Sequence, residues 1–82
     1  MMREIKIGGK YRHYMGNFYE VIAVARDSEE PQKELVIYKA LYDSPEFGKN
    51  QVWVRPLEEF LEEITKDGKT FFRFEEVTEL SK

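Results

Sequence analysis

Residues 9–26 read GKYRHYMGNFYEVIAVAR, and this stretch decides the fold because it holds two strands and the turn between them. Gly16-Asn17 is a tight-turn signal, since glycine and asparagine adopt a positive φ at low cost. Lys10–Tyr14 precedes this turn, and Phe18–Arg26 follows it as an apolar run rich in β-branched and aromatic residues. The sequence therefore predicts a β-hairpin.

Two more strands are predicted after the hairpin. A polar loop that contains a proline leads to Glu34–Tyr42, ELVIYKALY, which has the composition of a third strand. Residues 43–50 form a second predicted loop. The short run QVWVR, residues 51–55, is the expected fourth strand, and it ends at Pro56, which lacks an N–H for a sheet.

From Pro56 onward the sequence supports two interpretations. The apolar residues that recur at helical spacing are Leu57, Phe60, Leu61 and Ile64. The run KDGK at 66–69, however, is a hairpin turn signal. We expect a single helical turn over about Pro56–Leu61 and then a hairpin from about Glu62 to Val77, with Asp67-Gly68 at its tip.

This order of elements defines the expected fold class. Five to six short strands with close turns and one short helical turn predict a mainly β chain, folded as a small antiparallel barrel or strongly bent sheet. A parallel sheet is not expected because no crossover helix lies between strands. With 82 residues, the chain is expected to form one domain over residues 1–82.

Composition predicts a soluble, cytoplasmic protein. The chain has no cysteine, which suits a reducing compartment, and neither a signal peptide nor a membrane-spanning segment is recognisable. No membrane partner is therefore expected. The net charge is −3, from 13 basic and 16 acidic residues, and this disfavours nucleic acid as a partner without excluding it.

Three segments carry a family resemblance: GKYRHYMGNFYEVIAVARDSE, ELVIYKALY and VWVRPLEEFLE. Together they resemble a family of small bacterial proteins known as domain of unknown function 1653, whose signature is GKYRHYxGNxYEV followed by WVRPLxxF. The match extends over roughly residues 9–74. The resemblance implies an SH3-like β-barrel, and it brings no activity, substrate or catalytic residue.

Strand alternation suggests where a ligand would bind. In the fourth strand Val52 and Val54 point to one side, and Trp53 and Arg55 point to the other. If the valines fill the barrel, Trp53 and Arg55 lie outside, on a face that also bears Tyr38 and Tyr42. Such a face could stack a base, a proline ring or a planar ligand, with the guanidinium pairing an anion. The structural alternative is that Trp53 packs against the helical turn and Arg55 pairs with a glutamate.

The first strand divides into two faces, with Tyr11 and His13 on one and Arg12 and Tyr14 on the other. His13 could act as an acid or base near neutral pH, but it is the only histidine, and no nucleophile or metal ligand set accompanies it. No cofactor, metal site or catalytic residue is predicted. The candidate ligand-binding residues are Tyr11, Arg12, His13, Arg26, Tyr38, Trp53 and Arg55.

We expect a non-enzymatic binding module that recognises a protein or peptide through an aromatic and basic surface. Two alternatives stay open: binding of single-stranded nucleic acid, and a small enzyme or accessory subunit that acts on an anionic small molecule through His13 and nearby arginines. Self-association through an exposed strand edge is a third hypothesis, because small sheets are prone to it.

Overall fold

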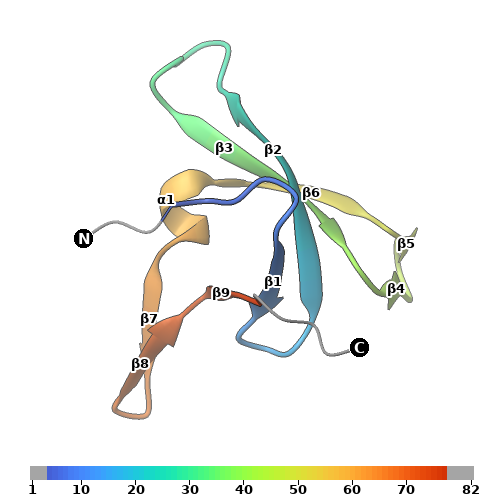
Figure 1. Ribbon diagram of the computed structural model, residues 1–82, viewed down its shortest axis with the longest axis vertical. Coiled ribbons are helices and arrows are strands. Elements are labelled where there is room, and N and C mark those ends of the chain that lie inside the picture. The colour runs from blue at the N-terminus through green and yellow to red at the C-terminus, as the bar shows by residue number, and fades with distance from the viewer. Residues whose placement is uncertain (1–3, 78–82) are drawn as a thin grey trace.

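The computed structural model describes residues 4–77, which form nine strands and one short helix. Five of these strands make the main antiparallel sheet, in the order β6-β3-β2-β1-β9 (Figure 1). Its strands are β1 (Lys10–His13), β2 (Phe18–Arg26), β3 (Glu34–Ala40), β6 (Val52–Pro56) and β9 (Phe74–Glu76). The prediction of a mainly β chain with antiparallel pairing is confirmed.

The first hairpin forms where the sequence predicts it. Strands β1 and β2 pair with Tyr11 opposite Tyr19, and the turn between them includes Gly16 at φ 115°. Strand β2 has a bulge between Val21 and Ala23, where its register with β3 shifts by one residue. A bulge bends its strand and increases the local twist. Strand β2 therefore curves along its nine residues.

The second half of the chain follows its prediction up to Phe72, but residues 74–76, predicted to belong to the hairpin, pair with β1 in the main sheet instead. Helix α1 (Leu57–Phe60) is a single turn, and β7 (Glu63–Lys66) pairs with β8 (Lys69–Phe72) in a two-stranded hairpin. Asp67 and Gly68 both have positive φ, 55° and 78°, as a two-residue type I′ turn requires. Figure 1 shows this hairpin projecting away from the main sheet, which the chain rejoins as β9.

Residues 43–50, predicted as a loop, contain a small hairpin of their own. Strand β4 (Asp43–Ser44) pairs with β5 (Gly48–Lys49). The Ser44 hydroxyl oxygen accepts the backbone N–H groups of Glu46 and Phe47, each at 3.2 Å, and so closes the turn. Short side-chain-to-backbone bonds of this kind organise tight turns without regular strand patterning. The sequence pattern therefore indicated only a loop.

The main sheet is open. Strands β6 and β9 form its two edges, and within residues 4–77 no sheet closes on itself. The barrel implied by the family resemblance is therefore not confirmed, although the sheet is curved in the way that its bulge requires. Between β6 and β9 the chain passes through α1 and the β7–β8 hairpin. This hairpin is a separate two-stranded sheet, so it does not join the two edges of the main sheet.

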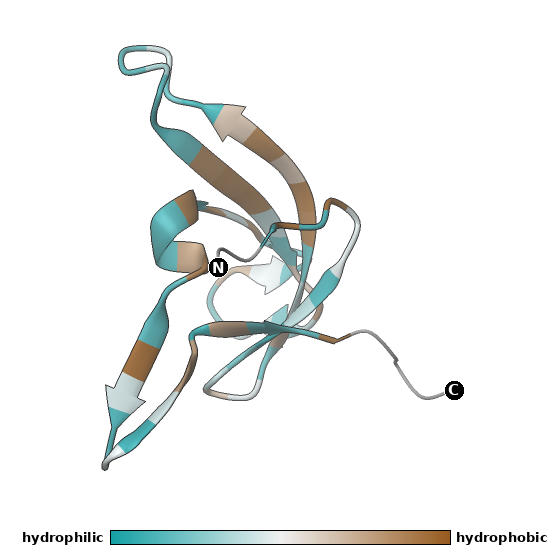
Figure 2. Ribbon diagram, turned by 60° about the vertical axis from the view of Figure 1, so that its left-hand side comes forward, coloured by the Kyte–Doolittle hydropathy of each residue, from teal (hydrophilic) through white to brown (hydrophobic). Residues whose placement is uncertain are grey.

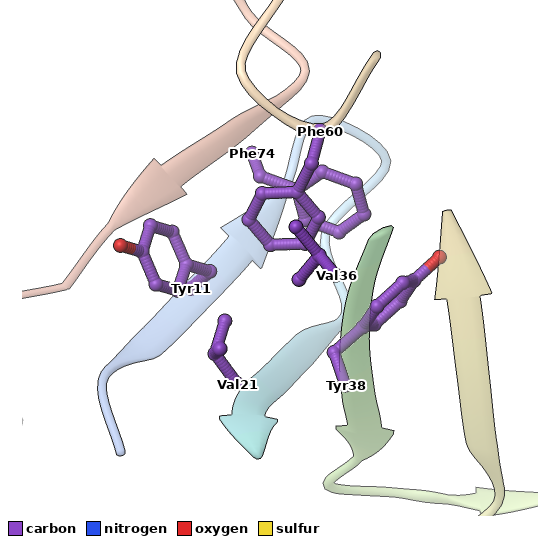
Figure 3. Packing of buried hydrophobic residues seen from close by; sticks show 6 residues of the cluster. All are labelled: Tyr11, Val21, Val36, Tyr38, Phe60 and Phe74. Atoms are coloured by element: carbon purple, nitrogen blue, oxygen red, sulfur yellow. The ribbon is translucent and has the colours of Figure 1, made fainter. Parts of the chain in front are cut away.

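The core lies on the concave side of the main sheet, where α1 covers it (Figure 3). Six side chains form its centre: Tyr11, Val21, Val36, Tyr38, Phe60 and Phe74. Phe60 from the helix stacks on Phe74 from β9 with ring centroids 4.0 Å apart and nearly parallel planes. Burial of Phe60 therefore holds the helical turn against the sheet.

Strand β6 adopts the structural alternative and not the orientation in which the valines fill the barrel. Val52 and Val54 are 47% and 57% exposed, whereas Trp53 packs against the core and Arg55 pairs with Glu59. The cause is the register: Trp53 lies opposite Tyr38, whose side chain points inward, so Trp53 shares the inner face. Alternation alone was ambiguous for the sheet, and Figure 2 shows hydrophobic residues following one another directly over part of β3.

Within the described residues no helix is both long and apolar enough to cross a membrane.

Candidate functional site

Five side chains surround a cavity of about 210 Å³ on the concave face of the main sheet. They are Tyr19, Tyr38, Tyr42, Trp53 and Arg55, and we call this the aromatic cavity. Strand pairing brings them together: Tyr38 on β3 lies opposite Trp53 on β6, while Tyr19 on β2 lies opposite Ala40. Side chains of neighbouring strands that face the same side lie next to one another. Four aromatic rings and one cation therefore converge.

The tyrosines hold one another in fixed orientations. The ring of Tyr19 meets Tyr38 at 5.3 Å and Tyr42 at 5.6 Å, both edge to face, which is a favourable geometry for aromatic pairs. The hydroxyls of Tyr19 and Tyr42 are 3.0 Å apart and hydrogen-bonded. Burial, followed by this bond to Tyr42, raises the pKa of Tyr19. Tyr19 therefore stays a neutral phenol in the cavity wall.

Arg55 is the cation of the aromatic cavity, and its inner nitrogen is fixed. Its Nε donates to the Tyr38 hydroxyl at 3.3 Å, and its Cζ lies 5.7 Å from the ring centroid of Phe74. One outer nitrogen lies 3.6 Å from a carboxylate oxygen of Glu59, whose side chain is about half exposed. An exposed ion pair of this kind contributes little. The outer edge of the guanidinium can therefore exchange Glu59 for a ligand carboxylate or phosphate.

His13 lies beside this site but is not one of the side chains that line the aromatic cavity. Its ring packs against Phe74 at 4.9 Å, and its Nδ1 accepts the backbone N–H of Met15 at 3.1 Å. Burial lowers the pKa of His13 below its ordinary 6.5, and the positive charges of Arg55 and Arg73 lower it further. His13 is therefore neutral at physiological pH, with its ring proton on Nε2.

The other predicted site residues lie elsewhere. Tyr11 is only 1% exposed, in the core, where it leaves no surface for a ligand. Arg12 lines a separate cavity of about 170 Å³, which it shares with Tyr14 and residues of β8 and β9. Arg26 is exposed near the β2–β3 loop and donates to the Pro31 carbonyl at 2.8 Å. Of the predicted set, the structure brings together only Tyr38, Trp53 and Arg55 around one cavity.

Sequence reasoning missed Tyr19 and placed Tyr42 on the correct face without including it among the candidates. A signal for Tyr19 was present. The turn at Gly16-Asn17 fixes the β1–β2 register, and Tyr19 alternates in phase with the buried Val21 on the segment before the bulge. That phase points Tyr19 to the inner face.

Among the residues that the structure describes, acidic side chains do not cluster as they would in a metal centre. In the portion of the chain from residue 4 to 77, no group of three or more histidine, aspartate and glutamate side chains could hold a metal ion. Two of the glutamates instead pair with arginines, Glu59 with Arg55 and Glu62 with Arg73. These carboxylates limit the positive charge on the concave face.

The fold and site define a small, open, antiparallel β domain with an aromatic and arginine-lined cavity. Over residues 9–76 the chain matches the family described as protein of unknown function (DUF1653), and it belongs to that family. The crystal structure of a DUF1653 protein from Bordetella bronchiseptica is similar, with a TM-score of 0.78, 26% sequence identity, and coverage of 100% of this chain and 99% of that one. Comparison with curated proteins found no match.

Proposed function

We propose that this protein is a non-enzymatic binding module that recognises an extended segment of a partner protein through the aromatic cavity. The observation that carries the proposal is the convergence of four aromatic rings and Arg55 around one cavity on an open sheet face. Rings of this kind stack on a proline or aromatic side chain, and the guanidinium pairs with a carboxylate. The proposal also holds that the domain has an SH3-like architecture and that the protein acts in the bacterial cytoplasm.

The size of the cavity supports a peptide over a free small molecule. Pockets for drug-sized ligands enclose roughly 300–1,000 Å³, whereas this cavity encloses about 210 Å³. It can hold one ring or one short side chain. A ligand that fills it must gain most of its affinity from neighbouring surface, as an extended peptide does.

The position of His13 favours binding over catalysis. Its Nδ1 already accepts a backbone N–H, and its side chain lies outside the set that lines the aromatic cavity. A general acid or base must reach the proton that it transfers. No pair of a nucleophile and a base was recognised in the sequence. The arrangement therefore supports recognition of a ligand without chemical change.

Single-stranded nucleic acid is the second candidate, because aromatic rings beside an arginine also stack bases. Charge argues against it, since the chain carries −3 overall and Glu59 lies beside Arg55. Affinity for nucleic acid depends on neutralised phosphates and falls steeply with salt. A uridine octamer therefore serves as the competing probe.

The test uses selection from a random seven-residue phage-displayed peptide library on the immobilised protein. Trp53 is the sole tryptophan and lines the aromatic cavity, so its fluorescence reports occupancy directly. We expect selected peptides that contain an acidic residue near a proline or aromatic residue, shift Trp53 emission, and lose at least about tenfold in affinity on Arg55→Gln.

The matched control is Arg12→Gln, an exposed arginine of the separate cavity, which should leave peptide affinity unchanged. Failure to enrich any peptide, or enrichment of peptides that bind without changing Trp53 emission, would refute the proposal. Salt-sensitive binding of the uridine octamer that requires Trp53 and Arg55 would establish the nucleic-acid alternative instead.

A further inference from the structure

Strand β6 has a free edge whose backbone groups can be assigned from one hydrogen bond. The Ala40 N–H donates to the Gln51 carbonyl at 2.8 Å, next to the β3–β6 pairing. Because hydrogen-bonded pairs alternate in an antiparallel ladder, the next bonded pair is Tyr38 with Trp53, then Val36 with Arg55. The N–H and C=O groups of Val52 and Val54 therefore point away from β3, toward the edge.

Protection of this edge is limited to one charged side chain, Arg55, and to Pro56 at the end of the strand. The Val52 carbonyl accepts the Gln51 side-chain amide at 3.1 Å, but within residues 4–77 no backbone turn or loop bond engages Val54. Natural edge strands are generally protected by charged side chains, bulges or covering segments. Here the two outward residues are exposed valines instead. The free edge of strand β6 can therefore pair with one added strand, and Trp53 and Arg55 of the same strand form one wall of the aromatic cavity.

We infer that the partner segment binds as an added antiparallel strand along β6. This inference rests on the proposed function, which requires a peptide in the aromatic cavity, and it specifies how the peptide backbone is held. Strand addition supplies affinity through main-chain hydrogen bonds and specificity through alternate side chains. Both faces of β6 then contribute, with Trp53 and Arg55 on the concave side and the two valines on the convex side.

The register of an added antiparallel strand predicts which residue type the partner carries opposite each residue of β6. The residue opposite Arg55 is acidic, because it shares the concave face with the guanidinium and replaces Glu59. The residue opposite Val54 is β-branched and exchanges two backbone bonds with it. The residue opposite Trp53 is proline, whose ring stacks on the indole. Its missing N–H costs nothing there, because that position points away from β6.

Charge complementarity selects this occupant over strand β6 of a second copy of the chain. Pairing β6 with another β6 would match valine to valine, but it would offer Arg55 no carboxylate, since the run Val52–Pro56 contains no acid. The acidic partner strand satisfies both the backbone edge and the cation.

The probe is the peptide acetyl-Ser-Glu-Val-Pro-Val-Thr-amide, with Glu opposite Arg55, the first Val opposite Val54 and Pro opposite Trp53. Methylating the backbone nitrogen of that first Val removes the donor to the Val54 carbonyl, and affinity should fall about tenfold or more. Methylating the Glu nitrogen, which points away from β6, is the matched control and should have little effect. Trp53 fluorescence measures both affinities.

Amide hydrogen exchange by NMR gives an independent measurement. Binding should slow exchange of the Val54 amide at least about tenfold, while the Trp53 amide, already bonded to Tyr38, should change little. On the protein side, Val54→Pro removes the outward N–H without breaking a bond to β3, and it should lower the affinity for the peptide. Val54→Thr keeps this N–H and should leave the affinity unchanged.

Equal affinities of the two methylated peptides, or an unprotected Val54 amide, would overturn strand addition. The proposed function would survive that result if Arg55→Gln still weakened the peptides from the phage selection. No binding of the probe peptide would also overturn this inference, while the selection decides the proposed function separately. A concentration-dependent dimer in sedimentation that Val54→Pro abolishes would show that a second copy occupies the edge instead.

Discussion

Arg55 and Tyr38 are joined side chain to side chain across the β3–β6 pair, with Arg55 Nε donating to the Tyr38 hydroxyl at 3.3 Å. Tyr38 is buried, and its ring lies edge-on to Phe60 and Phe74 in the core. In Figure 3 its hydroxyl points toward the neighbouring strand β6. The bond therefore anchors the cation of the aromatic cavity directly to the hydrophobic core.

Tyr38→Phe should test this anchor. It keeps the ring and removes the acceptor, so the free energy of unfolding should fall by about 1 kcal/mol. The peptide affinity that depends on Arg55 should also fall, because the guanidinium loses its fixed orientation. Urea denaturation followed by circular dichroism measures the first effect, and Trp53 fluorescence measures the second. If Tyr38→Phe changed neither the free energy of unfolding nor the peptide affinity, the bond between Arg55 and Tyr38 would have no positioning role.

Glu59→Gln should strengthen binding of the acidic probe peptide. Glu59 lies 3.6 Å from Arg55 and is the carboxylate that a ligand must displace, so removing its charge should raise affinity about two- to fivefold. The control is Glu58→Gln, an exposed acid on the same helical turn. Similar gains from both variants would indicate a general charge effect instead of competition at Arg55.

His13 should titrate below pH 6.5 in the folded protein, because burial and then the charges of Arg55 and Arg73 disfavour its protonation. As the only histidine, it gives an isolated signal in an NMR titration. Arg55→Gln should raise its pKa toward 6.5. An unchanged pKa in this variant would exclude Arg55 as a cause.

The same shift makes folding stability depend on pH in a defined direction. A histidine with a lowered folded pKa is protonated more readily in the unfolded chain. Its contribution to the free energy of unfolding should therefore decrease as the pH falls below 6.5, and level off below the folded pKa. Replacing His13 with Gln should remove this contribution, as urea midpoints at several pH values would show.

Phe60→Leu should destabilise the fold by about 1 to 2 kcal/mol, because it removes the stacked contact with Phe74 and leaves part of a buried site unfilled. Phe47 is 53% exposed and its ring meets Trp53 edge to face at 5.4 Å, so Phe47→Leu should cost less than Phe60→Leu, about 0.5 kcal/mol. Thermal melts of the two variants provide the comparison. Equal shifts would mean that the helical turn does not depend on Phe60.

Much of the fold could be predicted because its signals are local. The turns at Gly16 and at Asp67-Gly68 require residues that accept positive φ, and the runs between them have strand composition. Helix α1 also falls inside its predicted range. The β4–β5 hairpin was missed because a serine hydroxyl, instead of a strand pattern, closes it.

Less of the candidate site could be predicted. Alternation correctly placed Trp53 and Arg55 together and separated Tyr11 and His13 from Arg12. It did not show which side faces inward, because β3 and β6 carry apolar residues on both faces. Arg26 and Arg12 were grouped with Arg55 by residue type alone, and pairing places them at different ends of the sheet.

The sequence by itself therefore determined most of the elements, the turns at Gly16 and at Asp67-Gly68, and the pairs of side chains that share a strand face, because each follows from local backbone preferences. Its motifs also indicated the family. Only the tertiary structure decided which face became the interior. The β3–β6 register sets Trp53 opposite the buried Tyr38, and the stacking of Phe60 on Phe74 covers that side of the sheet. These are contacts between distant segments, and burial over the whole sheet fixes them together.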